Sequence, residues 1–256
     1  MHTIALVTQK GGSGKSTLAI GLAIAAIADG HKVRLLETDP QGTVSNWRRR
    51  RTQAEPIVET VDSGFEIERK LSELAYHGLS LTIIDTAGGN GLMMQAAIGA
   101  ADLCLIPARP SPADIEATAP TLAAIRALDK PFAFVLNQTP PRSYRLAHAV
   151  SALSGTAAEP SAAATDPGET ATELSAMGVL ALPYIVLRND QQDALGAGLA
   201  VTEYALGGKS ADEIRGLWQW VWRKLTVRSL SAGPLTAGSP ASDAALYQQQ
   251  VLHAAG

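Results

Sequence analysis

The sequence predicts an α/β fold, a three-layer sandwich in which helices flank a mostly parallel central sheet. Short apolar runs rich in β-branched residues alternate with longer helical patterns along most of the chain. The short runs show no polar alternation, which is typical of strands covered on both faces. Of the 256 residues, 46% are hydrophobic, which is enough apolar material for one large core.

The elements follow one another in a regular order. The strands are expected at residues 3–7, 33–36, 81–84, 103–107 and 132–136, where the runs are short, apolar and without alternating charge. The helices are expected at residues 16–29, 65–76, 113–128 and 144–153, where longer segments repeat apolar residues at helical spacing. Gly30 is a suitable stop for the first helix. This order implies βαβ units with right-handed crossovers.

One domain is expected over residues 1–225. Residues 154–172 are rich in Ala, Ser, Thr and Pro, and we expect a flexible surface insertion there. Residues 226–256 are similarly poor in large apolar side chains and predict a flexible tail.

Composition limits the classes of function. The net charge is −3, so a nucleic-acid site would have to be a local basic patch. The only cysteine, Cys104, lies in an apolar run; we expect it to be buried, and one thiol builds neither a disulfide nor a cysteine-ligated metal site. The first residues carry no charged leader, and no run reaches the ~18–20 apolar residues that span a bilayer. We therefore expect a cytoplasmic protein.

Residues 9–17 read QKGGSGKST and join the first predicted strand to the first predicted helix. In this context glycines let backbone N–H groups turn toward a phosphate, and the helix adds the positive end of its dipole. Lys15 should reach the β- and γ-phosphates, and the Ser16 hydroxyl should ligate Mg²⁺. The predicted ATP-binding residues here are Lys10, Gly11, Gly12, Ser13, Gly14, Lys15, Ser16 and Thr17.

The second lysine, Lys10, makes this loop similar to the deviant Walker A motif of the ParA/MinD ATPases. In that family the extra lysine reaches the nucleotide of the partner subunit. The resemblance implies a homodimer that forms with ATP, in which Lys10 and Lys15 stabilise charge during hydrolysis.

Two later segments extend the resemblance. The sequence DPQG at 39–42 resembles switch I, which implies that Asp39 orients the attacking water and that Pro40 and Gln41 belong to the switch. Glu37 stands where the family usually has its first Asp. The sequence IIDTAGG at 83–89 resembles the Walker B strand and switch II. By that match Asp85 holds Mg²⁺ through a water, and Gly88 senses the γ-phosphate.

Residues 101–112, ADLCLIPARPSP, resemble the next family strand with its proline-rich exit. Asn137 ends the run VLN, as in family members where this Asn reads the edge of adenine. A turn residue without contact to the nucleotide is the alternative for Asn137.

Basic residues suggest which surface the protein uses. Residues 182–188 resemble the family strand that leads to a DNA-binding region, and residues 208–215 resemble the start of its last helix. The candidate DNA-contacting residues are Arg188, Lys209 and Arg215, with solvated surface cations as the alternative. The run Arg48–Arg51 is either a solvated helix end or a further contact to DNA or a partner.

The last predicted helix also allows a membrane alternative. Trp220, Trp222, Arg223 and Lys224 make it aromatic and basic, as in a helix that lies on a membrane. We favour DNA, because the apolar residues from Ile214 to Leu225 repeat as a core-facing stripe and the helix resembles the packed last helix of partition ATPases.

Together the resemblances imply a ParA-like switch. Its ATP-bound dimer would bind nonspecific DNA of the nucleoid and position a plasmid, a chromosome region or a protein cargo. Hydrolysis, stimulated by a ParB-like or adaptor protein, would release it. A MinD-like ATPase at the membrane surface is the alternative.

Overall fold

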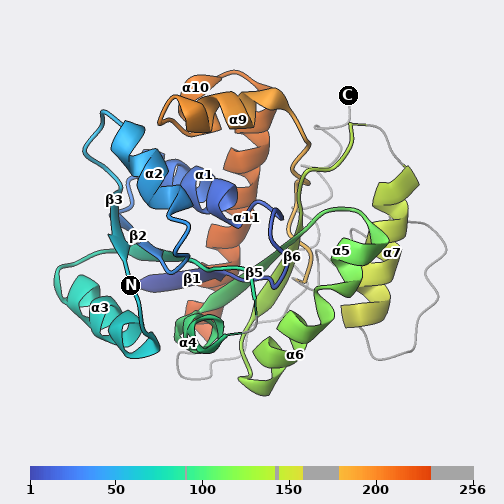
Figure 1. Cartoon of the computed structure of the whole chain (residues 1–256), viewed down its shortest axis with the longest axis horizontal. Coiled ribbons are helices and arrows are strands. Elements are labelled where there is room, and N and C mark those ends of the chain that lie inside the picture. The colour runs from blue at the N-terminus through green and yellow to red at the C-terminus, as the bar shows by residue number, and fades with distance from the viewer. Residues whose placement is uncertain (90, 142–143, 158–178, 232–256) are drawn as a thin grey trace.

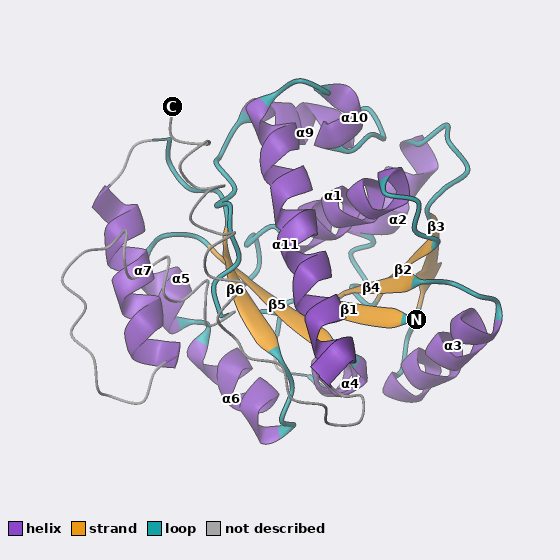
Figure 2. Cartoon of the chain, turned by 180° about the vertical axis from the view of Figure 1, so that it is seen from behind, coloured by secondary structure: helices purple, strands orange, loops and turns teal. Residues whose placement is uncertain are grey.

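The computed structural model describes residues 1–89, 91–141, 144–157 and 179–231. Figure 1 shows a central sheet with helices on both sides of it, and Figure 2 shows the same layers from behind. The predicted fold class is therefore confirmed.

Six strands form the sheet, and every neighbouring pair is parallel. Their order across the sheet is β3-β2-β4-β1-β5-β6. The strands are β1 (His2–Leu6), β2 (Val33–Glu37), β3 (Ile57–Thr60), β4 (Leu81–Asp85), β5 (Leu103–Ala108) and β6 (Phe132–Leu136). The five predicted strands are all present, within one residue at each end.

Each face of the sheet is covered by its own set of helices. The first face carries α1 (Lys15–Ala28), α2 (Thr43–Arg50), α9 (Asn189–Gly196), α10 (Val201–Tyr204) and α11 (Lys209–Ser231). The second carries α3 (Gly64–Tyr76), α4 (Leu92–Ala100), α5 (Pro112–Glu116), α6 (Ala119–Ala127) and α7 (Tyr144–Ala157).

Two cores follow from this layering. Along β1, Ile4 and Leu6 belong to the core under α1 and α11, whereas Ala5 belongs to the core under α4 and α6. Successive side chains of a strand point to opposite faces, and both faces are apolar here, so the strands needed no polar alternation. Cys104 is fully buried in β5, as expected, and burial raises the pKa of its thiol to about 12.

The helix predicted over 113–128 is wrong as a single element, because the chain forms α5 and α6 instead. Pro120 has no N–H to donate to the carbonyl of Glu116, so a continuous helix would lack this bond. Thr118 uses its N–H and its hydroxyl to bond the carbonyl of Ile115 at 3.0 and 2.7 Å. The chain therefore turns between the two short helices.

Other differences concern single elements. The sequence did not predict β3, a short edge strand, or α4, which starts just after a glycine-rich loop; nor did it predict the short helices α9 and α10. Residues 182–188 are not a strand of the sheet; within them Val186 makes an isolated bridge to Thr139, just beyond β6. Pro183 within this segment cannot donate a ladder hydrogen bond.

The two segments predicted to be flexible fall mainly outside the described residues. Positions 154–157 of the predicted insertion belong to α7, and α11 continues to Ser231 within the predicted tail. The remainder of both segments, 158–172 and 232–256, lies outside the part of the chain that the structure describes.

In the arginine run at the end of α2, Arg49 and Arg50 are exposed, whereas Arg51 is buried; a contact of the run with DNA or a partner stays a prediction. Arg51 is 9% exposed, forms two hydrogen bonds of 2.7 Å with the Glu203 carboxylate, and lies over the ring of Trp47. Arg50 donates to the carbonyl of Leu195 at 3.0 and 3.2 Å. These contacts of Arg50 and Arg51 fasten the end of α2 to α9 and α10.

The aromatic residues of α11 are also internal. Trp218 is 1% exposed and Trp220 5%, and both belong to the core against α1. Among the described helices, none is both long and apolar enough to cross a membrane.

We predict that Arg51→Ala destabilises the fold by roughly 2 to 3 kcal/mol, because it leaves the Glu203 carboxylate without its partner and removes the packing on Trp47. Urea unfolding measures this change. Arg49→Ala, at an exposed position of the same helix, is the control and should stay within about 0.5 kcal/mol of the wild type. Equal effects of the two substitutions would contradict the proposed role of Arg51 in holding α2.

Candidate functional site

The loop between β1 and α1 lies at the carboxyl edge of the sheet, where parallel α/β folds bind their ligands. Gly12 and Gly14 have φ of 76° and 90°, a left-handed conformation that suits glycine. At Gly14 a side chain would also collide with the amide of Asn137. The conformation of the loop therefore favours glycine at positions 12 and 14. The first turn of α1 follows the loop directly.

Lys15 and Ser16 begin α1 and face the end of β4. The Ser16 hydroxyl donates to Oδ2 of Asp85 at 2.6 Å. Lys15 Nζ lies 3.5 Å from the carbonyl oxygen of Lys10, so this ammonium lies along its own loop. Burial lowers the pKa of Lys15, while the carboxylates of Asp85 and Asp39 oppose that shift.

Asp85 is suited to hold a cation. It is 1% exposed, and its Oδ1 has no hydrogen-bond partner among the described residues. Burial raises the pKa of this carboxyl to about 7, against the opposing effects of Ser16 and Lys15. A buried carboxylate oxygen without a partner, next to a serine hydroxyl, fits the oxygen ligands that Mg²⁺ prefers. Ser16 and Asp85 are therefore the residues that would hold the metal.

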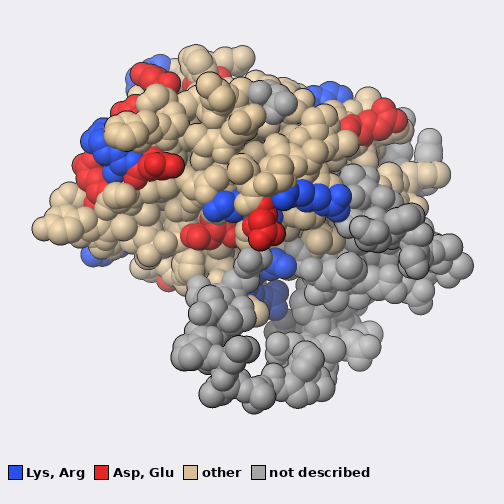
Figure 3. All heavy atoms as spheres, turned by 90° about the horizontal axis from the view of Figure 1, so that it is seen from below, with Lys and Arg blue, Asp and Glu red and all other residues tan. Residues whose placement is uncertain are grey.

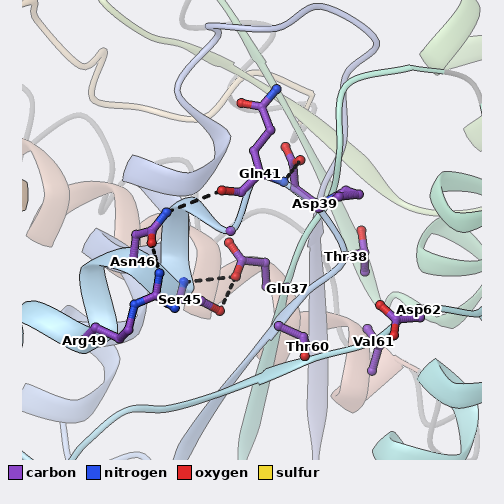
Figure 4. Close-up of a pocket in the computed structure, with 12 residues that line it drawn as sticks. Glu37, Thr38, Asp39, Gln41, Ser45, Asn46, Arg49, Thr60, Val61 and Asp62 are labelled. Atoms are coloured by element: carbon purple, nitrogen blue, oxygen red, sulfur yellow. Dashed lines mark hydrogen bonds between the residues drawn. The ribbon is translucent and has the colours of Figure 1, made fainter.

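Residues 37–42, which include the predicted switch I, line one side of a cavity of about 380 Å³, shown in Figure 4. Asp39 lines it and accepts the N–H of Gln41 at 2.9 Å. Glu37 is 1% exposed and accepts the N–H groups of Val44 at 2.6 Å and Ser45 at 3.0 Å. These are first-turn N–H groups of α2, so Glu37 holds the start of that helix and its negative charge faces the positive end of the dipole.

Switch II touches the phosphate loop at Gly88. A side chain there would lie 3.2 Å from the carbonyl oxygen of Gln9 and 3.5 Å from the nitrogen of Gly11. The backbone of Gly88 therefore lies close to the phosphate loop, and its role as a γ-phosphate sensor stays a prediction.

Lys10 points to a residue that the sequence did not single out. Its Nζ lies 3.2 Å from Oδ2 of Asp114, which is 6% exposed at the start of α5. Asp114 also accepts from Arg109 Nε at 3.1 Å and from the Ser111 hydroxyl. The pattern Ser-Pro-x-Asp at 111–114 predicts a capped helix start, but nothing in it indicates a contact with residue 10.

Asn137 lies beside the phosphate loop, and its side chain contacts the loop backbone. Its Nδ2 donates to the carbonyl oxygen of Ser13 at 2.7 Å, and the residue is 4% exposed. The next residue, Gln138, donates from Nε2 to the carbonyl oxygen of Gly12 at 3.0 Å. Reading of the adenine edge stays a prediction.

The three candidate DNA-contacting residues differ in their exposure and in their contacts with acidic side chains. Arg188 forms a double hydrogen bond of 2.7 and 2.8 Å with Glu213, which raises its pKa. Arg215 bonds Asp212 at 2.8 Å, and its side chain is 39% exposed. Lys209 is exposed at the start of α11. Lys209 and Arg215 are thus more available to an outside partner than Arg188.

Comparisons with known proteins give a consistent assignment. Residues 4–196 match the family described as the CobQ/CobB/MinD/ParA nucleotide binding domain. The maintenance of carboxysome distribution protein A of Gloeobacter kilaueensis is 34% identical over 115 residues, which are 44% of this chain and 52% of that protein. The chain spans about half the length of the curated relatives it matches first.

Two solved structures share the fold. A McdA variant from Cyanothece in complex with ATP has a TM-score of 0.63 at 19% identity, covering 87% of this chain and 96% of that one. MinD of Pyrococcus horikoshii with Mg-ADP has a TM-score of 0.62 at 18% identity, covering 89% and 98%. The predicted nucleotide and Mg²⁺ agree with the ligands in these structures.

We predict that, without Mg²⁺ and nucleotide, Asp85 makes the fold less stable as the pH rises from about 4 to about 7. The unfolded chain loses this proton near the ordinary pKa of 3.8, whereas the folded state keeps it to about 7. Relative to Asp85→Asn, the wild type should therefore lose on the order of 4 kcal/mol of unfolding free energy over this range.

Urea unfolding of both proteins at several pH values measures the difference. A wild-type-minus-variant difference that stays constant between pH 4 and pH 8 would show that Asp85 titrates in its ordinary range.

Proposed function

This chain belongs to the CobQ/CobB/MinD/ParA family of nucleotide-binding domains, and from this premise we propose that it is an ATPase that dimerises when it binds ATP. The ATP-bound dimer binds nonspecific DNA and positions a cargo, and hydrolysis releases it. A ParB-like or adaptor protein stimulates that hydrolysis. We expect the protein in the cytoplasm, associated with the nucleoid.

The observation that carries this proposal is the position of Lys10. The phosphate loop already has its own lysine, Lys15, with Nζ 3.5 Å from the loop carbonyl of Lys10. The ammonium of Lys10 instead lies against Asp114, and the Lys10 side chain is one-third exposed. A second cation at the rim of the loop, turned away from it, supports a role toward the nucleotide of a partner subunit. On dimerisation Lys10 would leave Asp114.

The roles of the other residues follow from the chemistry of phosphoryl transfer to water. Lys15 stabilises charge on the phosphates, and Asp39 orients the attacking water from switch I. Ser16 and Asp85 hold Mg²⁺, which when bound offsets phosphate charge. Because the Asp85 carboxyl is buried beside Lys15, the chain itself keeps this region poor in water.

A DNA surface is supported by relatives and by exposed cations. A protein named ParA from Rhizobium radiobacter is 31% identical over 126 residues. Lys209 is exposed and Arg215 partly exposed on the first turns of α11, and Arg188 reaches the Ser210 hydroxyl at 3.2 Å. In Figure 3 blue and red side chains are interspersed on the face seen from below, so the described part of that face carries no continuous basic field.

The membrane alternative receives no support from α11. The side chains that would have to enter a lipid surface include Trp220, which is 5% exposed and belongs to the core. A helix that used these residues for lipid would have to leave its place against α1.

We predict that Lys10→Ala abolishes ATP-dependent dimerisation and lowers ATP hydrolysis on the order of 100-fold, as expected for loss of a charge-stabilising group. Asp39→Ala should instead give an ATP-bound dimer that does not turn over. Light scattering during gel filtration with ATP or ADP, and phosphate release, measure these effects. Lys32→Ala, at an exposed position before β2, is the matched control. The trans-lysine proposal fails if Lys10→Ala dimerises and hydrolyses ATP like the control.

For the DNA surface we predict that Lys209→Ala and Arg215→Ala each weaken binding of ATP-loaded protein to random duplex DNA. The slope of log K against log salt should fall in magnitude by about 0.9 for each phosphate that the variant no longer neutralises. Fluorescence anisotropy across a salt series measures this slope. If both variants keep the slope of Lys32→Ala, DNA does not contact the start of α11.

A further inference from the structure

Two side-chain amides at the end of β6 hold two successive peptide groups of the phosphate loop. Asn137 Nδ2 donates to the carbonyl oxygen of Ser13 at 2.7 Å, and Gln138 Nε2 donates to that of Gly12 at 3.0 Å. Asn137 Oδ1 accepts the N–H of Gln138 at 2.9 Å, which links the two amides. The bonded residues are 124 and 126 positions apart in the sequence, so the fold alone brings them together.

These bonds determine where the loop N–H groups point. A peptide group is planar and trans, so its N–H points opposite to its carbonyl. The carbonyls of Gly12 and Ser13 face the two amides, and therefore the N–H groups of Ser13 and Gly14 point away from them. Within the described residues neither N–H has an acceptor. Successive free N–H groups that point to one side are the donors of an anion-binding nest.

Two backbone conformations near these hydrogen bonds are unusual. Gln138 has φ of 53°, a left-handed value that is unfavourable for a residue with a side chain. This conformation carries its amide to Gly12. Gly14 has φ of 90°, and a side chain there would displace the Asn137 amide. Both left-handed positions, Gly14 and Gln138, therefore lie at these contacts.

We propose that Asn137 and Gln138 form an amide clamp that keeps the phosphate loop in its phosphate-binding form. Both are positioning residues that act on the phosphates of any nucleotide through the loop backbone. The inference rests on the proposed nucleotide binding, but it differs from adenine reading by Asn137. Both polar atoms of the Asn137 side chain already have partners, and the residue is buried.

The test compares a ligand with a base and a ligand without one. Calorimetric titration measures the affinities of ATP and of inorganic pyrophosphate, each with Mg²⁺, for Gln138→Met, Asn137→Ala and the wild type. Methionine keeps the approximate length of glutamine and removes the donor. Loss of one such hydrogen bond should weaken both ligands by the same factor, on the order of 3- to 10-fold. Gln219→Ala, at an exposed position of α11, is the control and should change neither affinity.

The possible results separate the two proposals. Wild-type protein that binds neither ligand would contradict nucleotide binding itself. Variants that bind both ligands like the wild type would overturn the clamp alone, and so would an Asn137→Ala variant that loses affinity only for ATP. Steady-state kinetics add a second criterion, because the clamp predicts that Gln138→Met raises KM for ATP more than it lowers kcat. Gln138 is only partly buried, so this variant keeps the test valid even if Asn137→Ala unfolds.

Discussion

The constraint on which this structure depends is a parallel sheet covered by helices on both faces. Because both faces of such a sheet are buried, polar functional residues lie at the edge where its strands end. The phosphate loop follows β1, Asp39 follows β2, and Asp85 ends β4, the strand between them. Because β4 separates β1 from β2, its carboxylate lies between the loop and switch I. Burial then raises the pKa of Asp85 and leaves one of its oxygens without a partner among the described residues, which makes this point receptive to a cation.

Around this edge, side-chain contacts hold the ends of α2 in place. The Glu37 carboxylate holds the first turn of α2, and the far end of α2 is fastened to α10 through Arg51 and Glu203. Helix α2 therefore connects the segment after β2 to α10, and α10 packs against α11.

Much of the fold was predictable because buried parallel strands leave a strong pattern. Five strands and the helix after the phosphate loop were expected from apolar runs alone. The misses have local causes. The short edge strand β3 has half-exposed side chains and no continuous apolar run, α4 is short and adjoins glycines, and Pro120 interrupts a pattern that otherwise reads as one helix. The arginine run looked like a surface feature, because a sequence does not show that Glu203 lies opposite Arg51.

The chemical groups of the site can be read from the order of residues alone. The sequence shows glycines at fixed spacing, two lysines, a serine and carboxylates at strand ends. These are short-range patterns, so they can be recognised without the structure. What those groups contact depends on how the chain folds. Lys10 meets Asp114 and Asn137 meets the loop carbonyls because crossovers bring separate strand ends to one edge. Such pairs are set by the order of strands in the sheet, which the spacing of residues along the chain does not encode.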